Sequence, residues 1–184
     1  AKDRICSSDY VLLQLETPLE TVEYAIKMAH DNDVRVILNP APGRALSDAL
    51  MSRVDVLTPN ETEAAIIADQ AVTDIKSAEN AGLALLESGC KNVVITLGAG
   101  GALCISNDGV HHVSAFQVES IDTTGAGDAF NGALAVALAE GMPLVDAVRF
   151  ANAAGALCVT RLGTAPAMPQ RSEVERLLGD IQTY

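Results

Sequence analysis

Short apolar runs alternate along the chain with longer segments whose apolar residues recur at helical spacing. The runs rich in β-branched residues predict strands at residues 11–16, 34–38, 54–57 and 92–97. The segments with helical spacing predict helices at residues 17–32, 47–52, 61–67 and 74–88. Strands that alternate with helices predict an α/β fold, with a Rossmann-like, mainly parallel sheet flanked by helices.

Three helix boundaries are marked by particular residues. Thr17 precedes Pro18, and Glu20 follows three positions after Thr17, which predicts an N-cap, a first helical residue and a capping box. The same spacing from Ser172 to Glu175 predicts the cap of a last helix. A glycine after residue 88 predicts the end of the helix at 74–88.

The pattern changes after residue 97. An apolar run at 102–106, the turn Asn107-Asp108-Gly109 and a second run at 110–113 predict an antiparallel hairpin at one edge of the sheet. Two long apolar helices are predicted beyond it, at 128–140 and 143–159. Because the chain has no internal repeat and no low-complexity linker, we expect a single domain over residues 1–184.

The composition excludes several classes of protein. Apolar residues make up 49% and charged residues 20% of the 184 positions, so the chain is not of the disordered class. A net charge of −12 argues against nucleic-acid or anionic-membrane partners, and no apolar run is long enough to span a bilayer. The four cysteines show no CxxC spacing, which predicts reduced thiols and a cytoplasmic protein. An anionic small ligand remains compatible with this charge.

A glycine-rich turn, Gly98-Ala99-Gly100-Gly101, follows the strand predicted at 92–97. It is not a Rossmann fingerprint, because it leads into a second strand rather than a helix. A P-loop is also excluded, since GxxxxGK[ST] does not occur in the chain. Two interpretations stay open: a tight turn that needs positive φ, and a backbone surface that lies against a nucleotide.

A second glycine-rich turn, Gly125-Ala126-Gly127, opens a predicted helix and is followed by Asp128. Unpaired N–H groups at the positive end of a helix form an anion hole, and glycines let a phosphate approach closely. Asp128 is open to two interpretations. It is either an ordinary N-cap or a general base that accepts the proton of an attacking hydroxyl during phosphoryl transfer.

The segment 122–132 resembles the C-terminal signature of the ribokinase-like (phosphofructokinase-B) sugar kinases. Further matches in the order and spacing of that family lie at residues 13–20, 38–42, 58–64, 95–98 and 149–152. The resemblance therefore covers essentially the whole chain. It implies the family's fold and an ATP-dependent carbohydrate kinase, with D-ribose phosphorylated at its 5-hydroxyl. Another sugar or nucleoside kinase of the family, or an inactive nucleotide-binding fragment, is the alternative.

The resemblance also implies roles for individual residues. Asp128 would be the catalytic base, the amides of Gly125, Ala126 and Gly127 the anion hole, and Glu16 a contact to the sugar. The residues implied for the nucleotide are Asn60, Thr96, Leu97, Gly98, Ala99, Gly100, Gly101, Gly127 and Asn152.

Two metal sites are implied in the same way. Glu63, in the Asn-x-x-Glu element of the family, would organise magnesium. A potassium site beside the anion hole would draw on Asp122, Thr124, Cys158, Arg161, Gly163 and Ala167. Family members often carry Ser at the last of these positions, so Ala167 replaces a hydroxyl ligand.

The family pattern begins upstream of residue 1. We therefore expect the N-terminal strands, most of the sugar pocket and the lid to be absent from this chain, and the full-length enzyme to be a homodimer. We also expect the chain alone to be poorly stable or to self-associate, because the missing strands would leave an apolar sheet edge exposed.

Overall fold

The computed structural model describes residues 2–180, and within them six strands form one sheet in the order of the chain. The strands are β1 (Tyr10–Leu13), β2 (Arg35–Leu38), β3 (Val56–Leu57), β4 (Asn92–Thr96), β5 (Ala102–Ser106) and β6 (Gly109–Val113). Strands β1 to β4 pair in parallel, with Leu13 opposite Leu38 and Leu38 opposite Leu57. The sheet is thus mixed and mostly parallel, with one antiparallel pair, as the sequence predicts.

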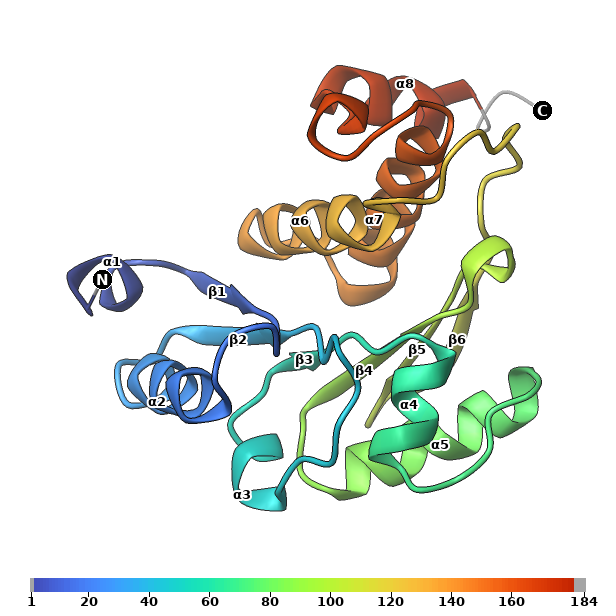
Figure 1. The fold of residues 1–184 in the computed structure, drawn as a ribbon. Helices are drawn as coiled ribbons and strands as arrows, with labels where there is room; N and C mark the ends of the chain where they lie inside the picture. Colours follow the sequence, from blue (N-terminus) through green and yellow to red (C-terminus); the bar gives the residue numbers. More distant parts are fainter. Residues whose placement is uncertain (1, 181–184) are drawn as a thin grey trace. The chain divides into compact units, whose positions relative to one another are not determined.

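The chain divides into two compact units. Unit 1 comprises Ala1–Leu97 with Leu103–His112, and unit 2 comprises Gly98–Ala102 with Val113–Tyr184. In unit 1, four helices lie on the same side of the sheet (Figure 1): α2 (Leu19–His30), α3 (Asp48–Met51), α4 (Glu61–Ile67) and α5 (Ile75–Glu87). A short helix, α1 (Lys2–Cys6), precedes β1 and contacts α2.

The core of unit 1 lies between the sheet and these helices. Val36, Leu38 and Ile95 of the strands pack in one cluster with residues such as Ile26 of α2 and Leu85 of α5. The alternate strand positions, including Ile37, Val56 and Val94, are equally buried. Strands buried at both sets of positions are typical of parallel sheets, which explains their continuous apolar runs.

Unit 2 consists mainly of helices: α6 (Ala126–Ala139), α7 (Leu144–Val159) and α8 (Arg171–Asp180). Helix α7 contacts both α6 and α8, and two short 3₁₀ turns lie at Gly98–Gly100 and Ala165–Ala167. At the crossing of α6 and α7, a Cβ built on Gly155 would lie 3.5 Å from the carbonyl oxygen of Ala126. The small residues of these helices therefore permit a close approach of their backbones.

Two predicted caps are wrong. Helix α2 begins at Leu19, with Pro18 as its N-cap and without a side-chain cap. Thr17 therefore lies before the N-cap, and Glu20 is the second rather than the third residue of the helix. Helix α8 begins at Arg171, which places Ser172 inside the helix. Glu173 rather than Glu175 reaches back there, and its carboxylate accepts a hydrogen bond from the Gln170 N–H at 2.7 Å.

The cysteines are free thiols. Cys90, Cys104 and Cys158 are buried and Cys6 is half-buried; burial raises the pKa of Cys90 and of Cys104 to about 12. They therefore act as small apolar side chains at neutral pH. Among the described helices, none combines the length and apolar character needed to cross a bilayer.

Candidate functional site

A polar network joins the carboxyl ends of β1, β2 and β3. Gln14 Nε2 donates to Asn39 Oδ1 at 3.0 Å, and Asn39 Nδ2 donates to the Thr58 carbonyl at 2.8 Å. Asn39 is buried, and its backbone N–H donates to the Leu13 carbonyl. Glu16, the residue predicted to face the sugar, is exposed just beyond the end of β1. In parallel sheets, ligands bind outside this edge of the strands, so Glu16 lies where a ligand contact is expected.

The sequence analysis did not single out Gln14 or Asn39. Both are polar residues that follow an apolar strand directly, and that position is the signal that could have identified them.

Helix α4 begins with a complete capping box. Asn60 Oδ1 accepts from the Glu63 N–H at 2.8 Å, and Glu63 Oε2 accepts from the Asn60 N–H at 2.9 Å. Thr96, at the end of β4, lies beside this start through a parallel bridge to Asn60, and its N–H donates to the Pro59 carbonyl. The structure thus brings together Asn60, Glu63 and Thr96, three of the residues predicted to serve the nucleotide and its magnesium.

Glu63 is an unusual carboxylate because it is 8% exposed. Burial raises its pKa, although the hydrogen bond from the Asn60 N–H acts in the opposite direction. Among the described residues, no Lys or Arg forms an ion pair with Glu63. A nearby cation would therefore offset the cost of its buried charge.

The glycines at 98–101 combine a tight turn with open space. Gly101 has φ +94°, and a Cβ there would lie 2.1 Å from the Val113 carbonyl oxygen, so only glycine fits. Gly98 has φ +53°, and no atom lies within 4 Å of a Cβ built on it. Gly101 is therefore explained by the close approach of its own backbone to Val113, whereas Gly98 leaves space for a ligand.

Helix α6 begins without a side-chain cap. Its N-cap is Gly125, with φ +80°, and the Ala126 N–H donates to the Thr123 carbonyl in the turn that leads into the helix. A Cβ built on Gly127 would meet no atom of the described residues within 4 Å. The first N–H groups of a helix point outward from its start, so this open end can receive an anion.

Asp128 is exposed and is the third residue of α6. The interpretation of Asp128 as an N-cap is therefore wrong, because the helix begins two residues earlier than predicted. Asn131, one turn further, is buried and donates from Nδ2 to the Gly127 carbonyl at 2.9 Å.

Two loops of unit 2 are joined through Asp122. Its Oδ1 accepts from the Thr124 N–H at 2.9 Å and from the Thr124 hydroxyl at 2.6 Å, and its Oδ2 accepts from the Gly163 N–H at 3.0 Å. These three donors lower the pKa of Asp122 to about 2. The Val159 carbonyl adds a further connection, since it accepts from the N–H groups of Ile121 and Asp122.

The remaining residues predicted for the potassium site lie in the same region. Cys158 Sγ is 3.9 Å from the Thr124 carbonyl oxygen, and the Arg161 N–H donates to the Cys158 carbonyl. Ala167 packs with Cys158 and Ala129 in a small apolar cluster. All six predicted residues are therefore linked by contacts within unit 2.

Asn152, predicted to lie by the adenine, is buried in α7. Its Nδ2 donates to the carbonyls of Val113 at 3.1 Å and Ser114 at 3.4 Å. Asn152 thus holds the segment after β6, which is the same backbone that requires glycine at position 101.

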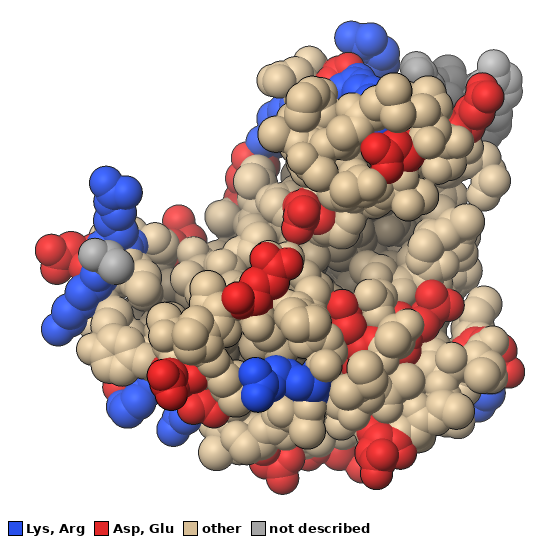
Figure 2. Space-filling model, in the orientation of Figure 1, with Lys and Arg blue, Asp and Glu red and all other residues tan. Residues whose placement is uncertain are grey.

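Acidic side chains are spread over the face drawn in Figure 2, and the basic ones on that face are scattered rather than gathered in a patch. Within residues 2–180, no group of three or more His, Cys, Asp or Glu side chains is arranged to hold a metal ion.

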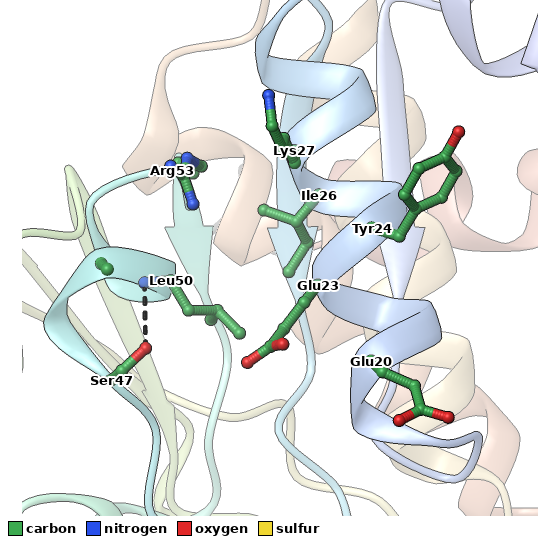
Figure 3. Close-up of a pocket in the computed structure, with 9 residues that line it drawn as sticks. Glu20, Glu23, Tyr24, Ile26, Lys27, Ser47, Leu50 and Arg53 are labelled. Atoms are coloured by element: carbon green, nitrogen blue, oxygen red, sulfur yellow. Dashed lines mark hydrogen bonds between the residues drawn. The ribbon is translucent and has the colours of Figure 1, made fainter.

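A cavity of about 390 Å³ lies between α2 and α3 (Figure 3). Charged side chains of α2, among them Glu23 and Lys27, line it together with Arg53, which follows α3. None of the predicted site residues belongs to its lining.

Comparisons with known proteins identify the family of the chain. The model of the pfkB family carbohydrate kinase matches residues 3–171. The ribokinase of Haemophilus influenzae is 44% identical over 175 residues, covering 95% of this chain and 57% of that protein. The deoxyribokinase of Salmonella typhi is 36% identical over 169 residues, covering 91% of this chain and 55% of that protein.

Among solved structures, Arabidopsis thaliana ribokinase complexed with ribose and ATP superposes with a TM-score of 0.91 at 32% identity. The match covers 96% of this chain and 58% of that one. The chain thus spans somewhat more than half the length of the relatives that it matches.

Proposed function

The chain belongs to the pfkB family of carbohydrate kinases, and from this premise we propose that it carries the catalytic and nucleotide-facing part of an ATP-dependent sugar kinase. The observation that carries the proposal is the start of α6. It is capped by a left-handed glycine, it is open at Gly127, and it bears an exposed carboxylate, Asp128, in its first turn. This combination provides anion-binding amides beside a proton acceptor.

The proposed reaction is an in-line phosphoryl transfer. The sugar hydroxyl oxygen forms a bond to the γ-phosphorus of ATP, and the bond from that phosphorus to the bridging oxygen breaks, so ADP leaves. Asp128 accepts the hydroxyl proton, while the amides of Gly125, Ala126 and Gly127 stabilise the charge on the transferred group. The helix dipole of the 14-residue α6 acts in the same direction.

The nucleotide would be held mainly by backbone. We assign it to Asn60 at the start of α4, to the turn from Thr96 to Gly101, to Gly127 and to Asn152. The open space at Gly98 supports this assignment, whereas Gly101 and Asn152 also have structural roles. The ATP in the Arabidopsis ribokinase is a precedent for the ligand.

Glu63 fits a role beside magnesium. Its burial makes a cation favourable, and Mg²⁺ is commonly bound through one or two carboxylates together with phosphates and water. When bound, the ion supplies charge neutralisation on the phosphate oxygens.

The loops joined by Asp122 fit a potassium ion because they bring carbonyl oxygens and one carboxylate together. Ala167 packs among apolar residues and its own side chain carries no hydroxyl, so that position would contribute at most its backbone carbonyl. The ion would neutralise charge beside the anion-binding turn.

We propose D-ribose, phosphorylated at its 5-hydroxyl, as the sugar, with Glu16 among its contacts. The 44% identity to a ribokinase and the ribose in the Arabidopsis ribokinase complex support this sugar. Deoxyribose, or another sugar or nucleoside, is the alternative within the family. A cytoplasmic homodimer is the proposed form of the whole protein.

A panel of sugars tests this function on the whole protein in which the chain occurs. ADP release is measured with ribose, deoxyribose, fructose and a nucleoside, each with and without magnesium and potassium. We expect the largest kcat/KM with ribose. If ribose gave no more ADP than water while another sugar did, the ribose assignment would be wrong. ADP release that no sugar stimulates would favour a nucleotide-binding module without turnover.

A further inference from the structure

The carboxylate of Glu173 ties helix α8 to the loop that follows α7. Glu173 Oε1 accepts from Arg161 Nη2 at 2.5 Å, and Glu173 Oε2 accepts from Arg161 Nη1 at 3.4 Å and from the Gln170 N–H at 2.7 Å. The side chains of Arg161 and Glu173 are 35% and 30% exposed. The guanidinium and the carboxylate therefore form a two-point, partly desolvated pair, which is the geometry that fixes orientation best.

The tip of the loop that carries Arg161 is fixed mainly by polar contacts. Leu162 is 75% exposed, so burial of its side chain does not hold the loop, and Gly163 adopts φ +91°. The tip is connected on one side through Arg161 to Glu173, and on the other through the Gly163 N–H to Asp122. Loss of either connection would give the loop freedom that apolar packing cannot remove.

The same loop lies directly against the turn that opens α6. A Cβ built on Gly125 would be 3.3 Å from Met168 Cε and 3.5 Å from the Thr164 Cα. The Asp122 carboxylate accepts hydrogen bonds from the Gly163 N–H and from both the N–H and the hydroxyl of Thr124, the residue before Gly125. A displacement of residues 161–164 would therefore reach the anion-binding turn through both a hydrogen bond and direct packing.

We propose that Glu173 is a positioning residue for the turn Gly125–Gly127, acting through Arg161 and the loop 160–164. The inference rests on the proposed function, because the turn matters for turnover only in a kinase. Glu173 itself contacts neither the sugar nor the phosphate. It holds the backbone that sets where the amides point, and amides that stabilise a transition state lose effect with small displacements.

A double-mutant cycle on the whole protein tests the proposal. Arg161→Ala and Glu173→Ala should each lower kcat about 3–10-fold with the KM for ATP nearly unchanged, since the turn acts on the transition state. The double variant should lose no more than either single variant, because both changes break one connection. Glu173→Gln keeps an acceptor for the Gln170 N–H and should lie between wild type and Glu173→Ala.

The matched control is Glu175→Ala. Glu175 lies on the same helix and pairs with Arg171 at 2.7 Å, and among the described residues this pair makes no hydrogen bond to Arg161. Its kcat should stay within 2-fold of wild type, as is usual for the loss of a surface ion pair. Equal losses in Glu175→Ala and Glu173→Ala, or additive losses in the double variant, would overturn the proposal.

Hydrogen exchange on the whole protein separates this proposal from the proposed function. In Glu173→Ala, the amides at 122–126 and 160–164 should exchange about 10-fold faster than in wild type, while the core amides of α7 remain protected. This result would support the connection even if the whole protein phosphorylated no sugar. Unchanged exchange in those two segments, in a variant with wild-type thermal stability, would refute it even in an active kinase.

Discussion

The starts of α4 and α6 solve the same physical problem in opposite ways. Helix α4 closes its first turn with its own side chains, since Asn60 and Glu63 each accept a backbone N–H of the other residue. Helix α6 begins at Gly125, whose lack of a side chain leaves the helix without such a cap. Both starts lie in segments that resemble the ribokinase-like signature.

The two helix starts differ in whether the proposed site residues also stabilise the fold. At α4 the proposed nucleotide and magnesium residues cap the helix, so a substitution there affects stability and activity together. At α6 no side chain caps the helix start and the carboxylate of Asp128 is exposed, so function can change without loss of the fold. The predictions below test this contrast, from the largest expected effect to the smallest.

The largest effect should follow Asp128→Asn. This change keeps the size of the side chain and removes the proton acceptor, so kcat of the whole protein should fall by about 10²–10⁴. Binding of an ATP analogue, measured by calorimetry, should change little because the amides remain.

Asp146→Asn is the matched control, because Asp146 is also the third residue of its helix, α7, and is also exposed. Turnover should be retained there. If Asp128→Asn kept nearly full turnover, Asp128 would have no catalytic role and the proposed mechanism would fail.

Gly127→Ala should separate stability from activity. Nothing within 4 Å obstructs the new Cβ, and alanine favours the helix over glycine by about 0.5–1 kcal/mol. The melting temperature should therefore rise, while the methyl group hinders a phosphate at the amides and lowers kcat/KM by about 10-fold or more.

Gly132→Ala, further along α6 and equally unobstructed, provides the comparison. It should raise the melting temperature without the loss of turnover. A Gly127→Ala enzyme as active as wild type would show that no anion is bound at this helix start.

At α4, stability and activity should fall together. Asn60→Ala removes the cap and should lower the free energy of unfolding by about 1 kcal/mol, measured by urea denaturation. Activity should fall as well, since the same side chain is assigned to the nucleotide.

Helix α5 offers a second capping box for comparison, in which Asp74 Oδ1 accepts from the Ser77 N–H at 2.7 Å. Asp74→Ala should also lower stability, but turnover by the remaining folded protein should be unchanged. Equal loss of turnover in the two variants would assign the effect of Asn60 to folding alone.

The smallest effects should appear in the pH dependence of the free energy of unfolding. Ionisation of Asp122 should stabilise the fold, whereas ionisation of Glu63 should destabilise it. Hydrogen bonds lower the pKa of Asp122 to about 2, so its stabilisation is present above its ordinary pKa of 3.8 and is lost as the pH falls toward 2. The stability difference between wild type and Asp122→Asn should therefore shrink across that window.

Burial raises the pKa of Glu63 above 4.5, so its ionisation destabilises the fold as the pH rises through that value. Glu63→Gln should consequently be more favourable, relative to wild type, at pH 7 than at pH 4. Urea midpoints of wild type, Asp122→Asn and Glu63→Gln, measured from pH 2 to pH 7, test both predictions. If the two variants showed the same pH dependence relative to wild type, the opposite pKa shifts of Asp122 and Glu63 would be contradicted.

Much of the fold follows from local sequence. The alternation of strands and helices, the hairpin at β5 and β6, and the bounds of α4 and α5 agree with the pattern to within one or two residues. The predicted caps at α2 and α8 are wrong because a Ser or Thr followed three positions later by an acidic residue is compatible with several starting points of a helix. The spacing of apolar residues identifies the buried face of a helix, but it does not fix the residue at which the helix begins.

The sequence by itself determined the element types and, through the resemblance, the family, because helical spacing, turn residues and signature segments depend on neighbours a few positions apart. Only the tertiary structure decided that Gly101 must be glycine, since the Val113 carbonyl occupies the place of its Cβ. It also decided that Asp122 meets Gly163, 41 residues away, and that Arg161 pairs with Glu173, 12 residues away. Such contacts depend on how distant segments pack, and no local period or propensity encodes them.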